Sequence, residues 1–466
     1  MRKSGKIRFT RKTTGVFLLL SGIALYVAPP AMAADACAAP CNTPAKSCAD
    51  CDKIFSNAGS KLTDELARLN KECCAPKCDD SCTTCAKPAD CCATNGGCDS
   101  CCDDGGLLGD CCLGDPWEAF GTNDDGIKIG GWAQFGYHSE NTGLFNNLGK
   151  GLNLHQGYLY VEKVADGSCG LDWGFRVDGV YGVDGTDTQA FGNPAGNFDF
   201  VNGFDHGIYS FAIPQLYAEI ADGDTSVIAG HFYTIAGYEV VPATGNFFYS
   251  HAMTMFRSEP FTHTGILATH QASDTMKVFG GWTLGWDTGF DRLNMASPMN
   301  NGNNFLGGAS VDVSDDVNVT YTTTVGDLGT RGSGYSHSIV VDTSLADDLN
   351  WVVLSDMVDT NQGAGGHEYG LTNYLFHTLN DCWSIGTRLE WWKSNAIGPG
   401  MQSEYAWTFG VNYKPHANVV IRPELRHDWN RNIGTAAAPG IPSAFGGRGN
   451  TKSDFTSVGV DVIFTF

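Results

Sequence analysis

Apolar and polar residues alternate along the chain from Ile127 onward, in segments of about 10–14 residues. Such alternation is typical of strands that bury one face and wet the other. We place sixteen strands here, beginning near Ile127, Asn153, Leu171, Gly207, Thr225, Thr262, Thr275, Asn304, Asp316, Tyr335, Leu349, His367, Cys382, Ser403, Asn418 and Ser453. The pattern predicts an all-β, antiparallel structure.

The connections between these strands alternate between short turns and long loops. The short turns mostly hold Asp, Gly or Asn, which tolerate tight backbone geometry. The long loops lie near 139–152, 183–206, 237–261, 288–303, 327–334, 360–366, 394–402 and 430–452. Short turns on one rim and long loops on the other are the pattern of an outer-membrane β-barrel. We therefore expect residues 126–466 to form a transmembrane antiparallel β-barrel of about 16 strands.

The last strand carries the clearest membrane signal. Its apolar face consists of Val458, Val460, Val462, Phe464 and Phe466, and its other face is dominated by Ser457, Gly459, Asp461 and Thr465. Lipid covers such a face in a closed membrane barrel, whereas a soluble sheet, the alternative, needs protein to cover it. We expect this strand to close the barrel by pairing with the first strand, near residues 127–138.

Three neighbouring strands near the end of the chain carry charges on one face and apolar residues on the other. On the strand from Asn418, Ile421, Leu425 and Trp429 alternate with charged residues. Several charges on one strand face fit poorly in a packed core and well against a water-filled lumen. The candidate pore-lining residues of these strands are Arg388, Glu390, Glu404, Arg422, Glu424, Arg426 and Asp428.

The first residues of the chain predict export. Residues 1–12 carry six positive charges, an apolar run follows from Val16 to Ala28, and Ala31-Met32-Ala33 is a small-x-small cleavage signal. The apolar run is shorter than the ~18–20 residues of a spanning helix, so we expect residues 1–33 to be a cleaved signal peptide. Since no other apolar run of about 18 residues follows, a membrane-spanning form of this chain would have to be a barrel.

Cysteines mark off a separate module, which we place at residues 34–125 and in the periplasm; it holds sixteen of the 18 cysteines. We expect it to be mostly irregular, with one short helix between Lys53 and Glu72. Exported Cys-rich segments are more often stapled by disulfides than bound to zinc, although CxxC pairs leave zinc as the alternative. Adjacent cysteines rarely pair with each other, so the doublets need distant or intermolecular partners. The disulfide candidates are Cys37, Cys41, Cys48, Cys51, Cys73, Cys74, Cys78, Cys82, Cys85, Cys91, Cys92, Cys98, Cys101, Cys102, Cys111 and Cys112.

The charge balance narrows the range of functions. The chain has 29 basic and 51 acidic residues and a net charge of -22. Loss of the basic leader would make the mature chain more acidic still. An acidic chain lacks the basic footprint that nucleic acid needs. No nucleophile elbow or zinc-protease signature occurs either, so we expect no enzyme, no cofactor and no metal site.

Three sequence patterns carry a family resemblance. They are Gly130-Gly131-Trp132, the alternating Gln156-x-Tyr158-x-Tyr160-x-Glu162, and Gly230-His231-Phe232-Tyr233-Thr234 followed by Gly237-Tyr238-Glu239. Over residues 120–466 the chain resembles the OmpL-like beta-barrel porin family of planctomycete-type envelopes. The resemblance implies an outer-membrane pore and supplies no catalytic or ligand residues.

The layout is also similar to that of the sixteen-stranded trimeric porins, in which the third long loop folds into the barrel and narrows it. Here the third long loop, residues 237–261, carries the apolar run Phe247-Phe248-Tyr249. We expect it to be the constriction loop, and a surface loop is the alternative. The candidate constriction residues are Glu239, His251, Arg257 and Glu259.

These patterns together predict passive diffusion of small hydrophilic solutes through an outer-membrane barrel, with a mild cation preference from the acidic balance. The expected partners are outer-membrane lipid, the solutes, and further copies in a homotrimer, the last by likeness to the trimeric porins. The alternative is a structural envelope protein. In that case the barrel is a membrane anchor, and the Cys-rich arm crosslinks to the wall or to a disulfide-linked envelope partner.

Overall fold

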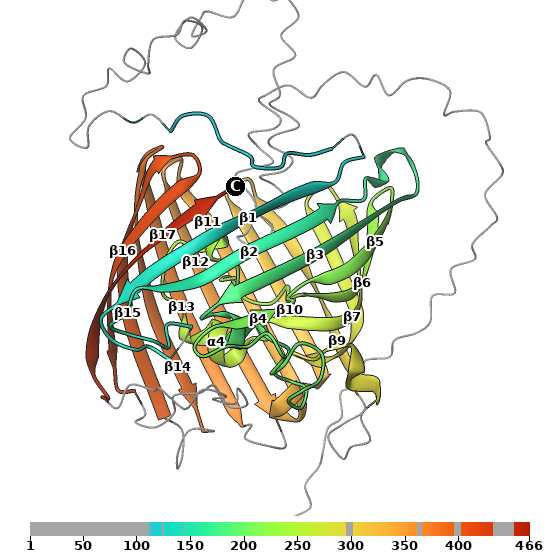
Figure 1. Ribbon diagram of the computed structural model, residues 1–466. Coiled ribbons are helices and arrows are strands. Elements are labelled where there is room, and N and C mark those ends of the chain that lie inside the picture. Colours follow the sequence, from blue (N-terminus) through green and yellow to red (C-terminus); the bar gives the residue numbers. More distant parts are fainter. Residues whose placement is uncertain are drawn as a thin grey trace, which may run out of the picture. The chain divides into compact units, whose positions relative to one another are not determined.

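Strand pairing runs around a complete ring. The structure is a computed structural model that describes residues 111, 113–123, 125–143, 145–294, 302–360, 366–395, 402–431 and 452–466. In chain order its strands are β1 (Lys128–His138), β2 (Asn153–Lys163), β3 (Asp172–Gly182), β4 (Ser210–Ala212), β5 (Leu216–Asp222), β6 (Thr225–Tyr233), β7 (Thr262–Ser273), β8 (Met276–Trp286), β9 (Asn304–Ser314), β10 (Val317–Asp327), β11 (Ser333–Ala346), β12 (Leu349–Thr360), β13 (His367–Asn380), β14 (Trp383–Ser394), β15 (Gln402–His416), β16 (Val419–Trp429) and β17 (Phe455–Thr465). All pairings are antiparallel and β17 returns to β1, so the sheet closes into a barrel (Figure 1).

The seventeen strands of the described residues fill sixteen positions in the barrel, because β4 and β5 both pair with β3. Residues 213–215 separate these two strands, and Pro214 has no N–H group with which to continue the ladder. The prediction of a sixteen-stranded antiparallel barrel is confirmed. Each predicted strand start lies within three residues of an observed one.

The two rims of the barrel differ in their connections. Short turns gather at the rim where β17 ends, and long connections gather at the opposite rim (Figure 1). We call these the short-turn rim and the long-loop rim, and the predicted segregation of connections is confirmed. The remaining elements are α3 (Gly185–Thr188), α4 (Met253–Ser258), η2 (Gly167–Cys169), η3 (Ala243–Gly245), η4 (Phe290–Asn294) and η5 (Gly329–Arg331). No helix among the described residues has the length and apolarity that crossing a membrane requires.

The predicted alternation separates the inside of the barrel from the outside. On β17, Val458 and Val460 are exposed on the outer face, whereas Ser457 and Asp461 are buried on the inner one. Phe464 of β17 is also exposed, and β14 to β16 extend the outer apolar surface with exposed Leu389, Trp407, Phe409 and Leu425. A contiguous apolar surface of this kind is the face that lipid covers in a membrane barrel.

The closing strand is the predicted one. β17 pairs with β1, with Trp132 opposite Thr465. Just beyond this pair, Gly131 and Phe466 exchange two backbone hydrogen bonds of 2.9 and 3.0 Å. A Cβ atom at position 131 would lie 2.2 Å from the carbonyl oxygen of Tyr158, so only glycine allows this close approach.

Residues 113–123, which we call the rim segment, follow the short-turn rim before β1 begins. The carbonyl of Leu113 accepts a hydrogen bond of 2.8 Å from the N–H of Ala417, in the turn between β15 and β16. Trp117 and Asn418 exchange two hydrogen bonds, of 2.6 and 2.7 Å. These contacts bind the rim segment to a turn that is about 300 residues away in sequence.

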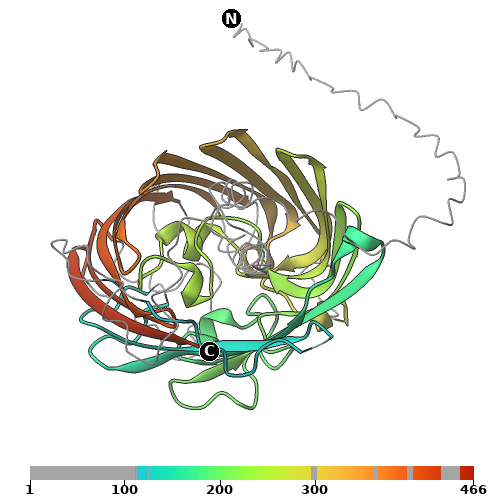
Figure 2. The same cartoon turned by 90° about the horizontal axis from the view of Figure 1, so that it is seen from above.

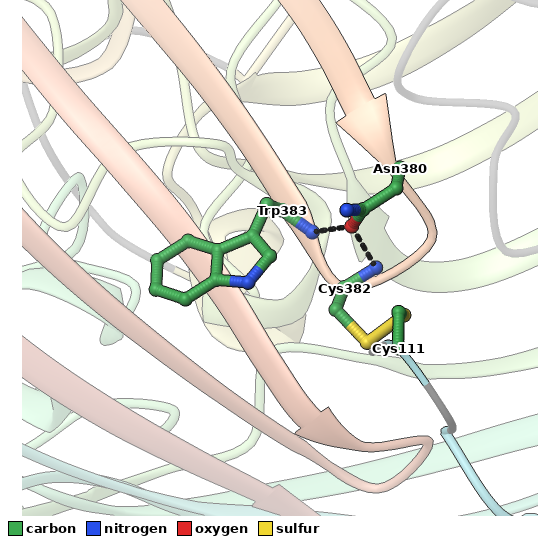
Figure 3. The surroundings of a disulfide bond; sticks show 4 residues. All are labelled: Cys111, Asn380, Cys382 and Trp383. Carbon is green, nitrogen blue, oxygen red and sulfur yellow. Dashed lines mark hydrogen bonds between the residues drawn. A yellow bond between two sulfur atoms is a disulfide. The ribbon is translucent and has the colours of Figure 1, made fainter. Parts of the chain in front are cut away.

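A disulfide fastens the chain immediately before the rim segment. Cys111 bonds to Cys382, in the turn between β13 and β14 (Figure 3). Asn380 holds this turn, since its Oδ1 accepts from the N–H groups of Cys382 and Trp383 at 3.0 and 2.9 Å. The expectation that doublet cysteines reach distant partners therefore holds for Cys111, whose partner was not among the sequence candidates. The other candidates, the predicted short helix and the predicted signal peptide lie outside the described residues.

Candidate functional site

One long connection lies inside the ring of strands. Residues 234–261 join β6 to β7 and contain η3 and α4; we call this connection L3. Seen along the barrel, α4 and the chain around it lie within the ring (Figure 2). The N–H of Thr234 donates to the carbonyl of Phe261 at 2.9 Å and closes the base of L3. The third long loop is thus inside the barrel and not on the surface.

All four candidate constriction residues are buried, and two of them pair with the inner wall. Glu239, His251, Arg257 and Glu259 are at most 4% exposed. Glu239 forms an ion pair of 2.6 Å with Arg388 of β14, and Arg257 forms one of 2.8 Å with Glu404 of β15. L3 contains no other charged residue or histidine. Glu239 and Arg257 therefore attach L3 to the wall, and the residues of L3 that stay partly exposed are uncharged.

Arg388 is the centre of the contact between the wall and L3. Its Nη1 donates to Glu239 Oε1 at 2.6 Å and to the carbonyl of Ser250 at 2.8 Å. Its Nη2 donates to Ser250 Oγ at 3.0 Å and to the carbonyl of His251 at 3.4 Å. Its Nε donates to Glu390 on the same strand at 2.8 Å. The planar guanidinium suits this position because it binds a carboxylate and backbone carbonyls at the same time.

Arg422 of β16 holds a second part of the L3 backbone. Its Nη1 donates to the carbonyls of Ala243 and Asn246 at 2.9 and 2.6 Å. Its Nε and Nη2 pair with Asp461 of β17 at 3.0 and 2.6 Å. Because Arg422 is only 3% exposed, L3 and the neighbouring strand supply the partners that water would otherwise provide.

Glutamates of the wall accept hydrogen bonds from the L3 backbone. Glu390 Oε2 accepts from the N–H of Met253 at 2.6 Å, at the start of α4. Glu424 Oε2 accepts from the N–H of Ser250 at 3.0 Å. Arg426 Nη1 donates to Glu390 Oε1 at 2.9 Å and so balances that carboxylate. The wall thus offers both donors and acceptors to L3.

Two arginines outside the candidate set extend this network. Arg431 pairs with Asp428 at 2.7 Å and with Glu404 at 3.1 Å. Arg331, at the end of η5 between β10 and β11, donates to the carbonyl of Arg257. Both lie in connections, where no strand alternation shows the direction of a side chain. The sequence pattern could not have placed them.

The alternating motif of β2 also reaches L3. Gln156 donates to the carbonyl of Val241 at 2.9 Å and accepts from the N–H of Ala243 at 3.0 Å. Tyr158 donates from its hydroxyl to Asp178 of β3 at 2.5 Å. The motif therefore joins β2 to L3 and to the adjacent strand. The period-two spacing of Gln156, Tyr158, Tyr160 and Glu162 indicates that these side chains share one strand face, but not that they contact L3.

Asp287 holds the exit of L3 at the long-loop rim. Its Oδ1 accepts from the N–H groups of Phe261 and Thr262 at 2.8 and 3.0 Å. Burial raises the pKa of Asp287 from 3.8 to about 7, although these two hydrogen bonds oppose the shift. The residue therefore changes its ionisation near neutral pH at a point where L3 meets β7.

The seven candidate pore-lining residues all face the inside of the barrel, but they are not open to a wide lumen. Their exposed fractions run from 0% for Arg388, Glu404, Arg426 and Asp428 to 9% for Glu424. L3 and neighbouring carboxylates cover them. We expected these residues to line open water. Instead, their main contacts are with L3 and with each other. Within the described residues, no group of three or more His, Cys, Asp and Glu is placed to hold a metal ion.

Comparison with known proteins agrees with the barrel. Among solved structures, the chain is similar to an anion-selective porin from Comamonas acidovorans, with 13% identity and a TM-score of 0.51 over 73% of this chain and 99% of that one. It is also similar to OmpF of Salmonella typhi in complex with daunomycin, with 11% identity and a TM-score of 0.50 over 74% of this chain and 99% of that one. Identities this low show a shared fold only.

No curated protein sequence matches the chain. Residues 126–466, however, match the family described as "Putative beta-barrel porin-2, OmpL-like". This match spans the whole barrel and agrees with the resemblance seen in the sequence motifs. On that match, the chain belongs to the OmpL-like beta-barrel porin family.

Proposed function

We propose that the protein is an outer-membrane porin through which small hydrophilic solutes diffuse passively. The observation that carries this proposal is a closed sixteen-position barrel with L3 attached inside it. A barrel of about eight strands is filled by its own side chains, whereas about sixteen strands leave a channel. L3 narrows that channel, and its buried ion pairs keep it in a fixed position.

A mild cation preference belongs to the same proposal. The chain carries 51 acidic and 29 basic residues, so the mouths of the barrel attract cations over anions. The preference is mild because the charges around L3 are paired. Arg388, for example, faces both Glu239 and Glu390.

Conductance of the purified full-length protein in planar lipid bilayers tests both statements. A porin gives discrete conductance steps, and a KCl gradient then gives a reversal potential on the cation side. A barrel that inserts without any conductance would overturn the porin proposal. Steps with a reversal potential near zero or on the anion side would remove only the cation preference.

The narrowing by L3 has a separate test. Glu239→Ala combined with Glu259→Ala removes both carboxylates from L3 and leaves Arg388 without its partner there. We expect a changed unit conductance, because L3 then shifts from the wall. The same double substitution at Glu219 and Asp312, which lie outside L3, is the control. Unchanged conductance and ion selectivity in the L3 variant would contradict the constriction.

The proposal also concerns the membrane around the barrel and the number of copies that assemble. Lipid contacts the outer apolar surface, and the short-turn rim faces the periplasm, because outer-membrane barrels have short periplasmic turns. The Cys-rich module of residues 34–125, which leads into the rim segment, then lies in the periplasm. We further infer a homotrimer from the likeness to trimeric porins. Protease access in whole cells tests the orientation, and native gels of the purified protein test the assembly.

The disulfide favours a second candidate function, that of a structural envelope protein. Cys111–Cys382 fixes the end of the Cys-rich arm to the barrel. The remaining cysteines of the arm could then crosslink a membrane-anchored barrel to the wall or to a neighbouring protein. Non-reducing gels of whole envelopes test this: higher-mass bands that reduction abolishes support it, and identical monomer bands with and without reductant contradict it.

A further inference from the structure

The residues of L3 that remain partly exposed are uncharged. Along its first half they include Ile235, Tyr238, Val240, Asn246 and Phe247. The charged residues between and after them are buried against the wall. A loop attached through its charges thus presents aromatic and aliphatic side chains to whatever passes it.

The strands on either side continue this uncharged surface. Ile235 packs against the same buried cluster as the partly buried Tyr217, Ile228 and Phe279 of β5, β6 and β8. On the other side, the ring of Phe376 on β13 lies 6.3 Å from that of Tyr238 and 4.8 Å from that of Phe247, between ring centres. Neutral side chains from L3 and four strands therefore meet at the level of L3.

Partly exposed charges inside the barrel lie elsewhere. The described strands place them on the halves next to the short-turn rim, as with Arg176, Glu219, Lys277, Asp312 and Asp342. Asp342, for example, lies two positions beyond Val340, whose side chain packs in the cluster that L3 contacts. Acidic and basic side chains are mixed in this part of the interior, next to the short-turn rim. A solute thus meets mixed charges near the short-turn rim and a neutral aromatic surface beside L3.

We propose that L3 and its neighbouring strands form a neutral aromatic passage that favours uncharged, ring-shaped solutes over charged or open-chain solutes of the same size. This proposal rests on the proposed porin function. The C–H face of a pyranose or aromatic ring packs against Tyr238 and Phe247, and tyrosine hydroxyls can bond to its polar edge. An anion gains nothing from this surface to replace the water it loses, and a cation gains only a cation–π attraction that is much weaker than its hydration.

Swelling of liposomes that contain the full-length protein tests the solute class. Glucose, sorbitol, glucosamine and gluconate have nearly equal sizes and are respectively a neutral ring, a neutral open chain, a cation and an anion. Background salt should be present to dissipate the potential that charged solutes create. We expect glucose to enter faster than each of the others, on the order of two- to tenfold, the range that one aromatic contact is worth.

Substitutions test whether the preference for glucose arises at L3. Tyr238→Asp places a charge on the neutral face and should reduce or reverse the advantage of glucose over glucosamine. Glu219→Gln, which changes a charge outside the passage, should leave that advantage in place. The wild-type solute series stands even where Tyr238→Asp fails to fold. Equal entry of all four solutes, or faster entry of the charged or open-chain ones, would overturn the proposal. Entry of no solute, together with no conductance, would instead overturn the porin function.

Discussion

Replacing Arg388 with methionine should release L3 from the wall. The substitution removes four hydrogen bonds to L3 and leaves the Glu239 carboxylate buried beside an apolar side chain. Loss of one partner from a buried ion pair costs about 3–5 kcal/mol. At about 1.4 kcal/mol per factor of ten, L3 should leave the wall about a hundred to several thousand times more often.

Hydrogen exchange measures this release directly. The N–H of Ser250 donates to Glu424 Oε2 of β16 at 3.0 Å, so its exchange reports whether L3 is docked. We expect faster exchange there in Arg388→Met and a larger, noisier unit conductance in bilayers. Glu390 loses one partner as well, but it keeps Arg426 at 2.9 Å, so the neighbouring strands should remain protected.

Two further variants show whether the ion pair is responsible. Arg176→Met removes a wall arginine that is mostly buried and whose ion pairs are with Glu162 and Asp178, not with L3. It should leave the exchange of L3 unchanged. Arg388→Met with Glu239→Gln removes both charges and should restore most of the protection, because no unpaired charge then remains buried. If Arg388→Met alone exchanges like the wild type, Arg388 does not hold L3.

Three other perturbations have definite expected outcomes. Asp287 has a folded pKa of about 7 against 3.8 in the unfolded chain, so its contribution to stability is lost as pH rises through about 7. The loss of stability from pH of about 6 to about 8 is about 1 kcal/mol. It should appear as weaker exchange protection of the two N–H groups that donate to Asp287, and Asp287→Asn should abolish this pH dependence. Gly237→Ala should loosen L3, because the backbone φ angle there is +81° and the new Cβ would lie 1.6 Å from a carboxylate oxygen of Glu259. Gly196→Ala is the control: its φ angle is +83° but its surroundings are open, so it adds backbone strain alone. Leu389→Arg, on the lipid face near mid-strand, should cost about 2–4 kcal/mol in urea unfolding from liposomes, and Leu345→Arg near the rim about 0–1 kcal/mol.

Each of these has a contrary result. If the protection at the L3 exit, after correction for the base-catalysed intrinsic exchange rate, stays constant with pH or varies equally in Asp287→Asn, Asp287 is not the cause. Equal loss of L3 protection in both glycine variants would show that backbone strain, and not the contact, matters at Gly237. Equal stability of the two arginine variants would contradict a lipid-covered mid-strand face.

The architecture followed from local patterns because strand alternation is a local property. On β17, the valines predicted to face outward do so, and Asp461 faces inward. Arg388 and Arg426 were correctly placed on the inner face for the same reason. Pro214 marked the break between β4 and β5 in advance, because proline cannot continue a ladder, although the strand prediction did not use it.

Pairing across the lumen could not be predicted in this way. The partner of Glu239 is 149 residues away, and nothing in the sequence separates Arg388 from the other arginines of the wall. L3 covers the inward-facing charges through tertiary contacts, which strand alternation does not reveal. From the sequence, these charges were therefore expected to line an open channel. Cys382 stands alone in its part of the chain, and cysteine spacing does not reveal connectivity.

The Cys111–Cys382 bond also decides how the barrel bears mechanical load. A pull on the chain before β1 would otherwise unzip that strand from its neighbours, one pair of hydrogen bonds after another. The disulfide diverts the force to the turn between β13 and β14, across 271 residues of sequence. Strands β1 to β13 are enclosed in a covalent ring and are shielded from the tension. Reducing conditions would therefore change the way the barrel yields to force, from shearing at an interior turn to peeling at its seam.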